Sequence, residues 1–226
     1  MAKPAEKTWQ PLWDDVFSSR SWGAYPSEDL IRFIARNYYN VPDRKKIKIL
    51  DMGAGTGANT LYLAREGFDT YALDGSSVAI DIIAQKMERE RLATSLQVGD
   101  IANLPYEDSF FDCIVELNCL MCNDDATTAM IIKNAADKLK PGGRFFSMSP
   151  KTGSWGYGQG KKIGEHTYTD AKDGPYTNLG LARFMDKDQI PGLYAPFHDL
   201  QINLSTHTRN NGENELSFWV IDGMKS

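Results

Sequence analysis

The sequence predicts an α/β fold: a doubly wound, mostly parallel sheet of seven strands with helices on both faces and an antiparallel last strand. Between residues 47 and 150, short apolar segments alternate with amphipathic helical segments. This alternation is typical of parallel strands joined by right-handed helical crossovers. A hairpin signal follows near the C-terminus. The chain has 226 residues, 42% of them hydrophobic, which suits one soluble domain.

The first 46 residues are rich in aromatic side chains and form the predicted helical cap or lid of the domain. Ser27 is the expected N-cap of a helix, because acidic residues follow it in the first turn. Apolar residues then recur at helical spacing from Leu30 to Tyr38. We expect the helix to end near Asn40, before Pro42.

The segment 47–150 is the predicted core of the sheet. A buried strand is expected at 48–52, and further strands are expected at 70–73, 95–98, 111–115 and 143–148. Its helices are expected at 58–65, 76–92 and 124–139. Pro141-Gly142 marks the turn before the fifth strand.

The segment 151–226 opens on a long glycine-rich loop, 151–180, which we expect to contact a substrate because long loops in compact domains are usually functional. A helix is predicted at 184–194, although Pro191 interrupts it. Strands at 200–206 and 216–221 form the closing hairpin around Asn210-Asn211-Gly212. Residues 1–226 are therefore read as a single domain.

Composition excludes several classes of function. Lys and Arg number 25 against 30 Asp and Glu, a formal net charge of −5, which argues against a dedicated nucleic-acid binder. The sequence contains no stretch of about 18 apolar residues, so it predicts no membrane span. The N-terminus shows no apolar signal-peptide region. Three clustered cysteines do not form a disulfide framework, so the cytoplasm is the expected compartment.

The strongest motif is a buried strand that runs into three alternating glycines, Gly53, Gly55 and Gly57. Glycine permits positive φ and close approach of a ligand to the backbone. The helix that follows offers unpaired N–H groups, so a nucleotide-like ligand is expected there. Asp74 ends the next strand, where a carboxylate can accept hydrogen bonds from ribose hydroxyls; the alternative is a helix cap. Asp100 follows the third strand and can face an adenine amine; the alternative is a turn aspartate.

Taken together, residues 47–150 resemble the core of the class I S-adenosylmethionine-dependent methyltransferases of the small-molecule type, with a Rossmann-like fold. The resemblance rests on the order and spacing of five segments. These are Leu50-Asp51-Met52-Gly53-Ala54-Gly55-Thr56-Gly57, Asp74, Gly99-Asp100-Ile101, Phe111-Asp112-Cys113-Ile114-Val115 and Leu139-Lys140-Pro141-Gly142-Gly143.

The resemblance implies a set of cofactor-binding residues. The glycine turn would hold the methionine moiety, Asp74 and its neighbours the ribose, and Asp100 with Ile101 the adenine. Leu117 and Asn118 would face the sulfonium. Trp22, Tyr25 and Arg20 belong to a segment that resembles the family's N-terminal lid; packing of aromatic side chains on the sheet is the alternative. The complete set is Asp51, Gly53, Ala54, Gly55, Gly57, Asp74, Gly75, Ser76, Asp100, Ile101, Leu117, Asn118, Trp22, Tyr25 and Arg20.

Differences from other methyltransferase families narrow the class of methyl acceptor. Amino-group DNA methyltransferases carry Asn/Asp-Pro-Pro-aromatic after the fourth strand, whereas this chain has Glu116-Leu117-Asn118-Cys119. The single CxxC pair, Cys119 and Cys122, lacks the further ligands of a zinc site, so no metal is expected. These features favour a small-molecule acceptor over nucleic acid.

His166 in the glycine-rich loop is the candidate general base, since its ordinary pKa suits proton removal near neutral pH; a surface histidine is the alternative. The predicted activity is methyl transfer from S-adenosylmethionine to a small polar metabolite, with an oxygen or nitrogen acceptor and sugars among the candidates. S-adenosylhomocysteine would be the product. The alternatives are an NAD(P)-dependent oxidoreductase, which would carry GxGxxG instead of GxGxG, and a non-catalytic cofactor-binding sensor.

Overall fold

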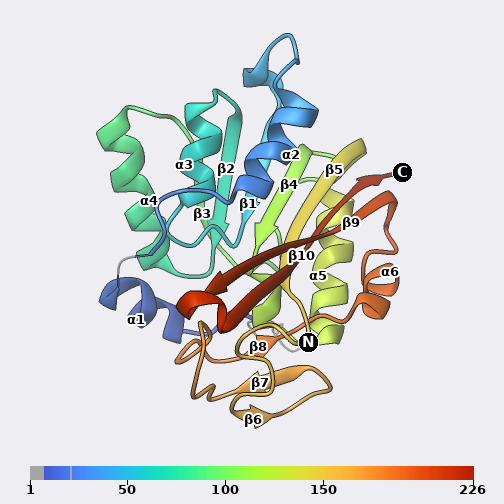
Figure 1. Cartoon of the computed structure of the whole chain (residues 1–226). Coiled ribbons are helices and arrows are strands. Elements are labelled where there is room, and N and C mark those ends of the chain that lie inside the picture. Colours follow the sequence, from blue (N-terminus) through green and yellow to red (C-terminus); the bar gives the residue numbers. More distant parts are fainter. Residues whose placement is uncertain (1–7, 21) are drawn as a thin grey trace, which may run out of the picture.

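A computed structural model describes residues 8–20 and 22–226 of the chain. Seven strands form the main sheet in the order β3-β2-β1-β4-β5-β10-β9 (Figure 1). The strands β1 to β5 pair in parallel, whereas β10 is antiparallel to both β5 and β9. The bounds are β1 Lys48–Met52, β2 Asp69–Asp74, β3 Ser95–Val98, β4 Phe111–Leu117, β5 Leu139–Pro150, β9 Phe197–Arg209 and β10 Asn214–Lys225. The predicted doubly wound sheet with an antiparallel last strand is confirmed.

The helices are α1 Leu12–Ser19, α2 Glu28–Tyr38, α3 Ala58–Arg65, α4 Ser77–Glu90, α5 Asp125–Lys138 and α6 Ile190–Leu193. Short 3-10 turns occur at Arg44–Lys46, Leu120–Cys122, Lys187–Gln189 and Asn210–Gly212. As predicted, the Ser27 side chain caps α2 by accepting from the Leu30 N–H. None of the described helices is long and apolar enough to cross a bilayer.

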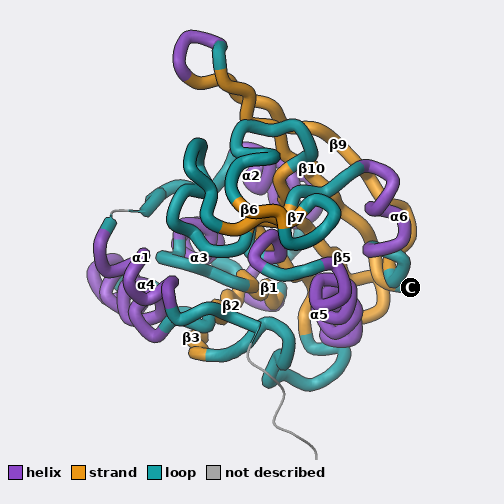
Figure 2. Tube along the Cα trace, turned by 90° about the horizontal axis from the view of Figure 1, so that it is seen from below, coloured by secondary structure: helices purple, strands orange, loops and turns teal. Residues whose placement is uncertain are grey.

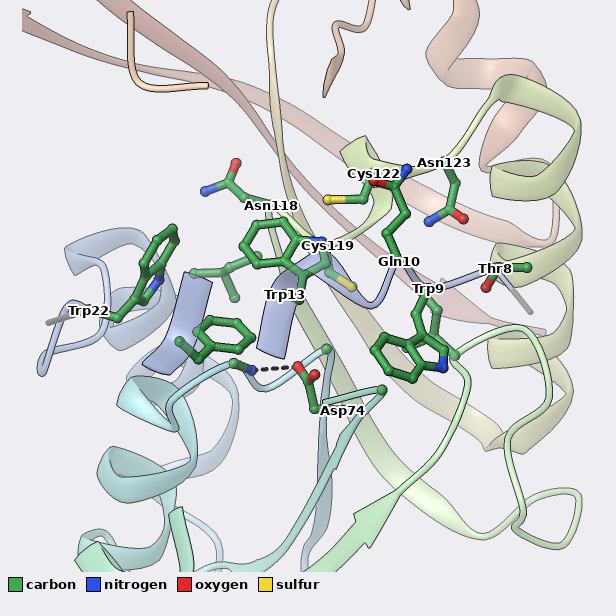
Figure 3. A pocket seen from close by; sticks show the side chains of 16 residues that line it. Thr8, Trp9, Gln10, Trp13, Trp22, Asp74, Asn118, Cys119, Cys122 and Asn123 are labelled. Atoms are coloured by element: carbon green, nitrogen blue, oxygen red, sulfur yellow. Dashed lines mark hydrogen bonds between the residues drawn. The ribbon is translucent and has the colours of Figure 1, made fainter. Parts of the chain in front are cut away.

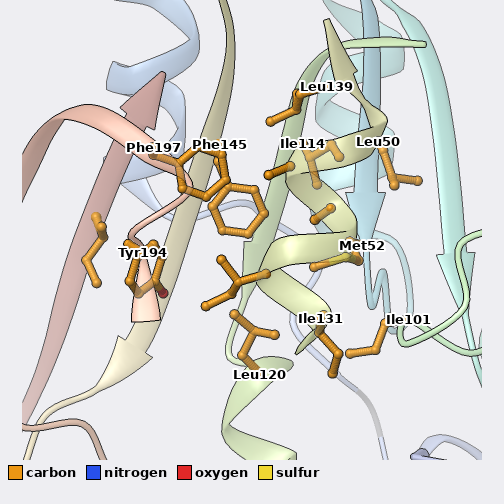
Figure 4. Packing of buried hydrophobic residues seen from close by; sticks show 14 of the residues in the cluster. Leu50, Met52, Ile101, Ile114, Leu120, Ile131, Leu139, Phe145, Tyr194 and Phe197 are labelled. Atoms are coloured by element: carbon orange, nitrogen blue, oxygen red, sulfur yellow. The ribbon is translucent and has the colours of Figure 1, made fainter. Parts of the chain in front are cut away.

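Hydrophobic side chains fill both faces of the sheet because successive residues of β1 point to opposite sides. Ile49 packs with α2 and α3 on one face, in a cluster that includes Phe33 and Phe146. Leu50 and Met52 face α5 on the other side, where they join the larger cluster shown in Figure 4. This packing fixes the carboxyl ends of β1, β2 and β4 side by side, so that the residues after each strand share one edge.

The predicted helix at 184–194 is wrong in its first residues. Residues Ala182–Arg183 form strand β8, residues 184–186 are not helical, and the helical part consists of the 3-10 turn Lys187–Gln189 followed by α6, which is four residues long with Pro191 in its first turn. Proline lacks an N–H and fits a helix only at its start, so the helix cannot extend back through Phe184.

The glycine-rich loop contributes two strands to a small sheet that the sequence did not reveal. These strands, β6 (Lys161–Lys162) and β7 (Thr167–Thr169), pair antiparallel with each other, and β7 pairs antiparallel with β8, which follows the loop. They are too short to show an alternating pattern. Figure 1 places this sheet below the main one, and Figure 2 shows α1 beside α4. Both elements lie close to the edge where the parallel strands end.

Candidate functional site

A cavity of about 190 Å³ opens at the carboxyl ends of β1, β2 and β4 (Figure 3). The turns after these strands form its floor, and residues before α2 form its roof. Its described wall consists of Thr8, Trp9, Gln10, Trp13, Phe17, Trp22, Gly53, Gly55, Asp74, Gly75, Ile101, Leu117, Asn118, Cys119, Cys122 and Asn123.

The glycine turn after β1 holds a backbone that other residues would strain. Gly53 has a φ of +73°, and a Cβ built on it would lie 2.1 Å from Cys119 Sγ. The N–H groups of Gly53 and Ala54 both donate to the Leu73 carbonyl, at 2.8 and 3.0 Å. The turn is therefore locked to the end of β2 while its backbone borders the cavity.

Asp51 lies buried beneath this turn. Its carboxylate accepts from Thr60 Oγ1 at 2.6 Å and from Asn59 Nδ2 at 3.4 Å, both on α3. Burial raises its pKa to about 6. The side chain supports the turn from below and does not belong to the described cavity wall.

Asp74 connects the turns that follow β1 and β2. Its carboxylate accepts from the Gly55 N–H at 2.8 Å and from the Ser76 N–H at 2.9 Å. Burial raises its pKa, while the two N–H groups oppose this change. A carboxylate has about four acceptor positions, so Asp74 keeps acceptor capacity for hydroxyl groups in the cavity that it lines.

Three aromatic rings at one end of the cavity contact one another. The ring centroids of Trp13 and Phe17 lie 5.4 Å apart, and Trp22 lies 6.0 Å from the first and 5.8 Å from the second. The sequence prediction included Trp22 and missed Trp13 and Phe17. Their spacing of four residues on the short helix α1 was the available signal, because such residues share one helix face.

The end of β4 supplies the polar part of the wall. Asn118 has a φ of +59°, and its N–H donates to the Met148 carbonyl at 2.8 Å. Its Oδ1 is buried with no partner in the described part of the chain. Cys119 and Cys122, also in the wall, have pKa values raised by burial. An acceptor-only amide oxygen in this position favours a ligand that brings an N–H or O–H group.

Glu116 anchors the turn that carries these wall residues. It is fully buried, and its Oε2 accepts from the N–H groups of Cys119 and Leu120, both at 3.2 Å. Its Oε1 accepts from Ser147 Oγ, which also contacts the Tyr194 hydroxyl at 2.7 Å. Burial raises the pKa of Glu116 to about 7.

Replacing Glu116 by glutamine should flatten the pH dependence of stability. The folded protein keeps the Glu116 proton up to about pH 7, whereas the unfolded chain releases it near pH 4.5. The free energy of unfolding therefore falls as pH rises through this window, by about 3 kcal/mol from this group. Urea unfolding at pH 5 and pH 8 measures the effect in wild type and Glu116→Gln. The exposed Glu107→Gln variant is the control, and equal pH slopes in all three proteins would contradict the expectation.

The structure brings together eight of the residues expected to bind the cofactor. Gly53, Gly55, Asp74, Gly75, Ile101, Leu117, Asn118 and Trp22 all line the cavity. Ala54, Gly57 and Ser76 are buried in the adjoining turns, where Gly57 and Ser76 cap α3 and α4. The sequence missed Thr8, Trp9, Gln10, Trp13, Phe17, Cys119, Cys122 and Asn123.

Other predicted residues lie elsewhere. Tyr25 is 81% exposed, and the exposed Arg20 places its guanidinium 5.9 Å from the centre of the Trp22 ring. Asp100 contacts Thr8 and is not part of the described wall. His166 lies next to β7, with Nδ1 3.0 Å from the Tyr157 hydroxyl, and it too is absent from the described wall. Within residues 8–20 and 22–226, no group of three His, Cys, Asp or Glu side chains could hold a metal ion.

Comparison with known proteins gives the context of this site. Residues 49–143 match the family described as "Methyltransferase domain". Demethylmenaquinone methyltransferase of Tropheryma whipplei is 36% identical over 98 residues, 43% of this chain and 39% of that protein. TehB of Haemophilus influenzae, named a probable S-adenosyl-L-methionine-dependent methyltransferase, is 32% identical over 108 residues, 46% of this chain and 37% of that protein. The chain thus spans about two fifths of the length of these relatives.

Solved structures extend the likeness to most of the chain. A crystal structure of a SAM-dependent methyltransferase from Methanosarcina mazei has a TM-score of 0.71 at 22% identity, covering 89% of this chain and 98% of that one. The TehB crystal structure has a TM-score of 0.66 at 21% identity, covering 95% and 67%. Residues 49–143 therefore match the methyltransferase-domain family, and the chain has the fold of these solved SAM-dependent methyltransferases.

Proposed function

We propose that this protein transfers a methyl group from S-adenosylmethionine to a small polar metabolite, with an oxygen or nitrogen acceptor and sugars among the candidates. The observation that supports this most directly is the position of Asp74. Its carboxylate lies in the cavity wall while it fastens the glycine turn through the Gly55 N–H. A carboxylate that can accept hydrogen bonds from ribose hydroxyls thus lies beside a glycine backbone that a ligand can approach closely. A nucleoside bound at the ends of parallel strands requires both features.

The wall residues suit four parts of this cofactor: the methionine moiety, the ribose, the base and the sulfonium. Gly53 and Gly55 would hold the methionine moiety, Asp74 the ribose, and Ile101 one face of the base. The rings of Trp13 and Trp22 offer cation–π attraction of about 0.5–2 kcal/mol to a sulfonium. The cavity of about 190 Å³ is smaller than the roughly 300–1,000 Å³ of most ligand pockets, so we expect the N-terminal segment to move when the cofactor binds.

The bound cofactor supplies an activated methyl group: its carbon–sulfur bond breaks as the acceptor atom bonds to the carbon, and S-adenosylhomocysteine leaves. The protein's part is to align the acceptor and exclude water. Orientation of this kind contributes about 7–11 kcal/mol at best. Asn118 Oδ1 is suited to accept a hydrogen bond from the acceptor group, and the three rings shield the site.

The test compares two cofactor classes and then searches for the acceptor. Calorimetry should show binding of S-adenosylhomocysteine and none of NADPH; the reverse result would contradict the proposal. Incubation with a metabolite extract and a methyl-labelled donor should label a small polar product. Binding of the donor without any labelled product would instead indicate a sensor. The proposal includes a cytoplasmic location and no nucleic-acid partner, in line with the net charge of −5 and the three free cysteines.

His166 remains the proposed base, but its position predicts a limited role. It lies beside Tyr157, outside the described cavity wall. We expect His166→Ala to lower kcat/KM for the labelled acceptor by less than tenfold, because a base positioned at the acceptor would contribute about 10²–10⁴-fold and His166 lies outside the described wall. A loss above a hundredfold would show that the loop carries His166 to the acceptor during the reaction. Tyr157→Phe, which removes its described partner, is the control for an indirect effect.

A further inference from the structure

The outer edge of strand β9 is open. β9 is the last strand of the seven-stranded sheet, and within the described residues no further strand pairs with its outer side. Of its thirteen residues only Phe197 is buried. Leu204, near its middle, is 52% exposed. The main-chain N–H and C=O groups along an open edge of this kind can pair with another extended chain.

The sequence of β9 lacks features that commonly block such pairing. Many proteins protect an open edge with lysine, proline or a very short strand. Residues 200–208 contain no Lys, Arg, Asp, Glu or Pro, and they include the β-branched Ile202, Thr206 and Thr208, which favour strands. The strand at the other edge of the sheet, β3, is only four residues long. The two edges therefore differ, and β9 is the one suited to accept a further strand.

The far end of the β9–β10 hairpin extends beyond the main sheet. β10 pairs with β5 only from Phe218 onward, whereas its pairing with β9 starts at Asn214. The glycine-rich loop supports the inner side of this extension, because the Lys151 N–H donates to the Ser217 carbonyl at 2.9 Å. In the part of the chain that the structure describes, no strand supports the outer side, and Figure 2 shows the end of the hairpin projecting from the body. A two-stranded hairpin alone is only marginally stable in water, so a third strand would stabilise it.

The charges of β9 are complementary to those of a second copy. A two-fold axis through Leu204 sets this leucine opposite its own copy and sets Asp199 opposite Arg209 of the second copy. Both charged side chains are exposed. Asp199 lines one surface pocket with Gln201, and alternation along the strand from Gln201 puts Arg209 on the same face. Opposed residues of an antiparallel pair share a face, so this register brings the opposite charges together at both ends.

We propose that two copies of this chain associate by antiparallel pairing of their β9 strands about a two-fold axis at Leu204, which joins the two sheets into one. The two Leu204 side chains meet at the centre of the contact, and Asp199 and Arg209 form ion pairs at its ends. The contact consists of about ten residues from each copy, fewer than the roughly 20–30 of a standard interface, so we expect a dissociation constant in the micromolar range. The inference is independent of the proposed methyl transfer.

Sedimentation equilibrium of the full chain tests the association. Wild type should contain both monomer and dimer over a range of about 1–200 µM. Leu204→Lys should raise the dissociation constant at least about tenfold, because it sets two like charges opposite each other. Val98→Lys is the matched control, since Val98 is 47% exposed on the other edge strand, and this variant should associate like wild type.

A double-mutant cycle tests the register. Asp199→Asn and Arg209→Gln should each weaken association about fivefold, and the double variant should be no more than about twofold weaker than either. Within one chain the two side chains lie about 30 Å apart, because ten residues of extended strand separate them. Coupling between them therefore arises only between copies. His198, whose Nδ1 lies 3.0 Å from Asp199 Oδ2, is unchanged in all of these variants.

Cross-linking with a short bismaleimide locates the axis. Leu204→Cys should give a covalent dimer, because opposed Cβ atoms lie about 4.5–5.5 Å apart. Thr208→Cys should not, because its two copies would lie roughly 25 Å apart. Wild type is the control for the three native cysteines.

Three results would each overturn the proposal: a wild type that stays monomeric over the whole range, equal association of Leu204→Lys and Val98→Lys, or single effects at Asp199 and Arg209 that multiply. A covalent dimer from Thr208→Cys and none from Leu204→Cys would do the same. None of these measurements uses a cofactor or a methyl acceptor. A failure of the proposed function would therefore leave them unchanged, and the two ideas can fail separately.

Discussion

Replacing Gly53 by alanine should abolish measurable binding of S-adenosylhomocysteine, a loss of more than about a hundredfold. The new methyl group would lie 2.1 Å from Cys119 Sγ and 2.6 Å from its Cβ, at a φ of +73°. Backbone strain costs about 1–2 kcal/mol for a non-glycine residue here. The contact forces either the turn or the β4 end to move. Since both border the cavity, we expect affinity to fall further than stability. Calorimetry and thermal unfolding measure the two effects.

Gly67→Ala is the matched control for this prediction. Gly67 has a φ of +85°, yet nothing lies within 4 Å of a Cβ built on it. The variant therefore introduces the same backbone strain without the collision, and it lies at the far end of α3. We expect a loss of about 1 kcal/mol in stability and unchanged affinity. Equal affinity losses in Gly53→Ala and Gly67→Ala would show that strain alone, and not the geometry of the cavity, disables binding.

Asp74→Ala should weaken S-adenosylhomocysteine binding by about a hundredfold or more. The substitution removes the proposed acceptor of the ribose hydroxyls, and hydrogen bonds to a charged group contribute about 1.5–3 kcal/mol each. It also leaves the Gly55 and Ser76 N–H groups without the carboxylate they bond. The loss of these two contacts loosens the turn that holds the methionine moiety.

Asp69→Ala provides the comparison, because Asp69 begins the same strand that Asp74 ends. Its carboxylate contacts the Tyr71 hydroxyl at 3.4 Å, away from the cavity. Asp69→Ala should bind S-adenosylhomocysteine within about twofold of wild type. Asp74→Asn tests the charge separately, because it keeps one acceptor oxygen. If Asp74→Ala also binds within twofold of wild type, the ribose assignment is wrong.

The parallel half of the fold could be predicted because its signals are local. The strand Lys48–Met52 and the helix Ala58–Arg65 were predicted with their observed bounds. Each combines an apolar pattern with a clear end: the glycine turn ends the strand, and Gly67 follows the helix. The floor of the cavity could be predicted as well, because the residues that follow parallel strands meet at one edge of the sheet. Gly53, Asp74 and Asn118 accordingly lie in one cavity.

The roof of the site could not be predicted in the same way. Trp13 and Phe17 reach the cavity through packing between α1 and residues such as Leu179, far away in the sequence. No local pattern encodes this contact. Asp100 similarly accepts a hydrogen bond from Thr8, which lies 92 residues away in the sequence. Strands β6 to β8 are two or three residues long, so pairing with neighbours, and not propensity, determines them.

Three of the five tryptophans of this chain, Trp9, Trp13 and Trp22, line the cavity at the carboxyl ends of the parallel strands. Indole emission changes with the polarity and rigidity of its surroundings, so the protein carries its own optical reporter at the site. Titrating candidate acceptors into an unlabelled sample should shift the emission spectrum whenever one of them enters. A library of metabolites can thus be screened by tryptophan fluorescence, before any methylated product is known.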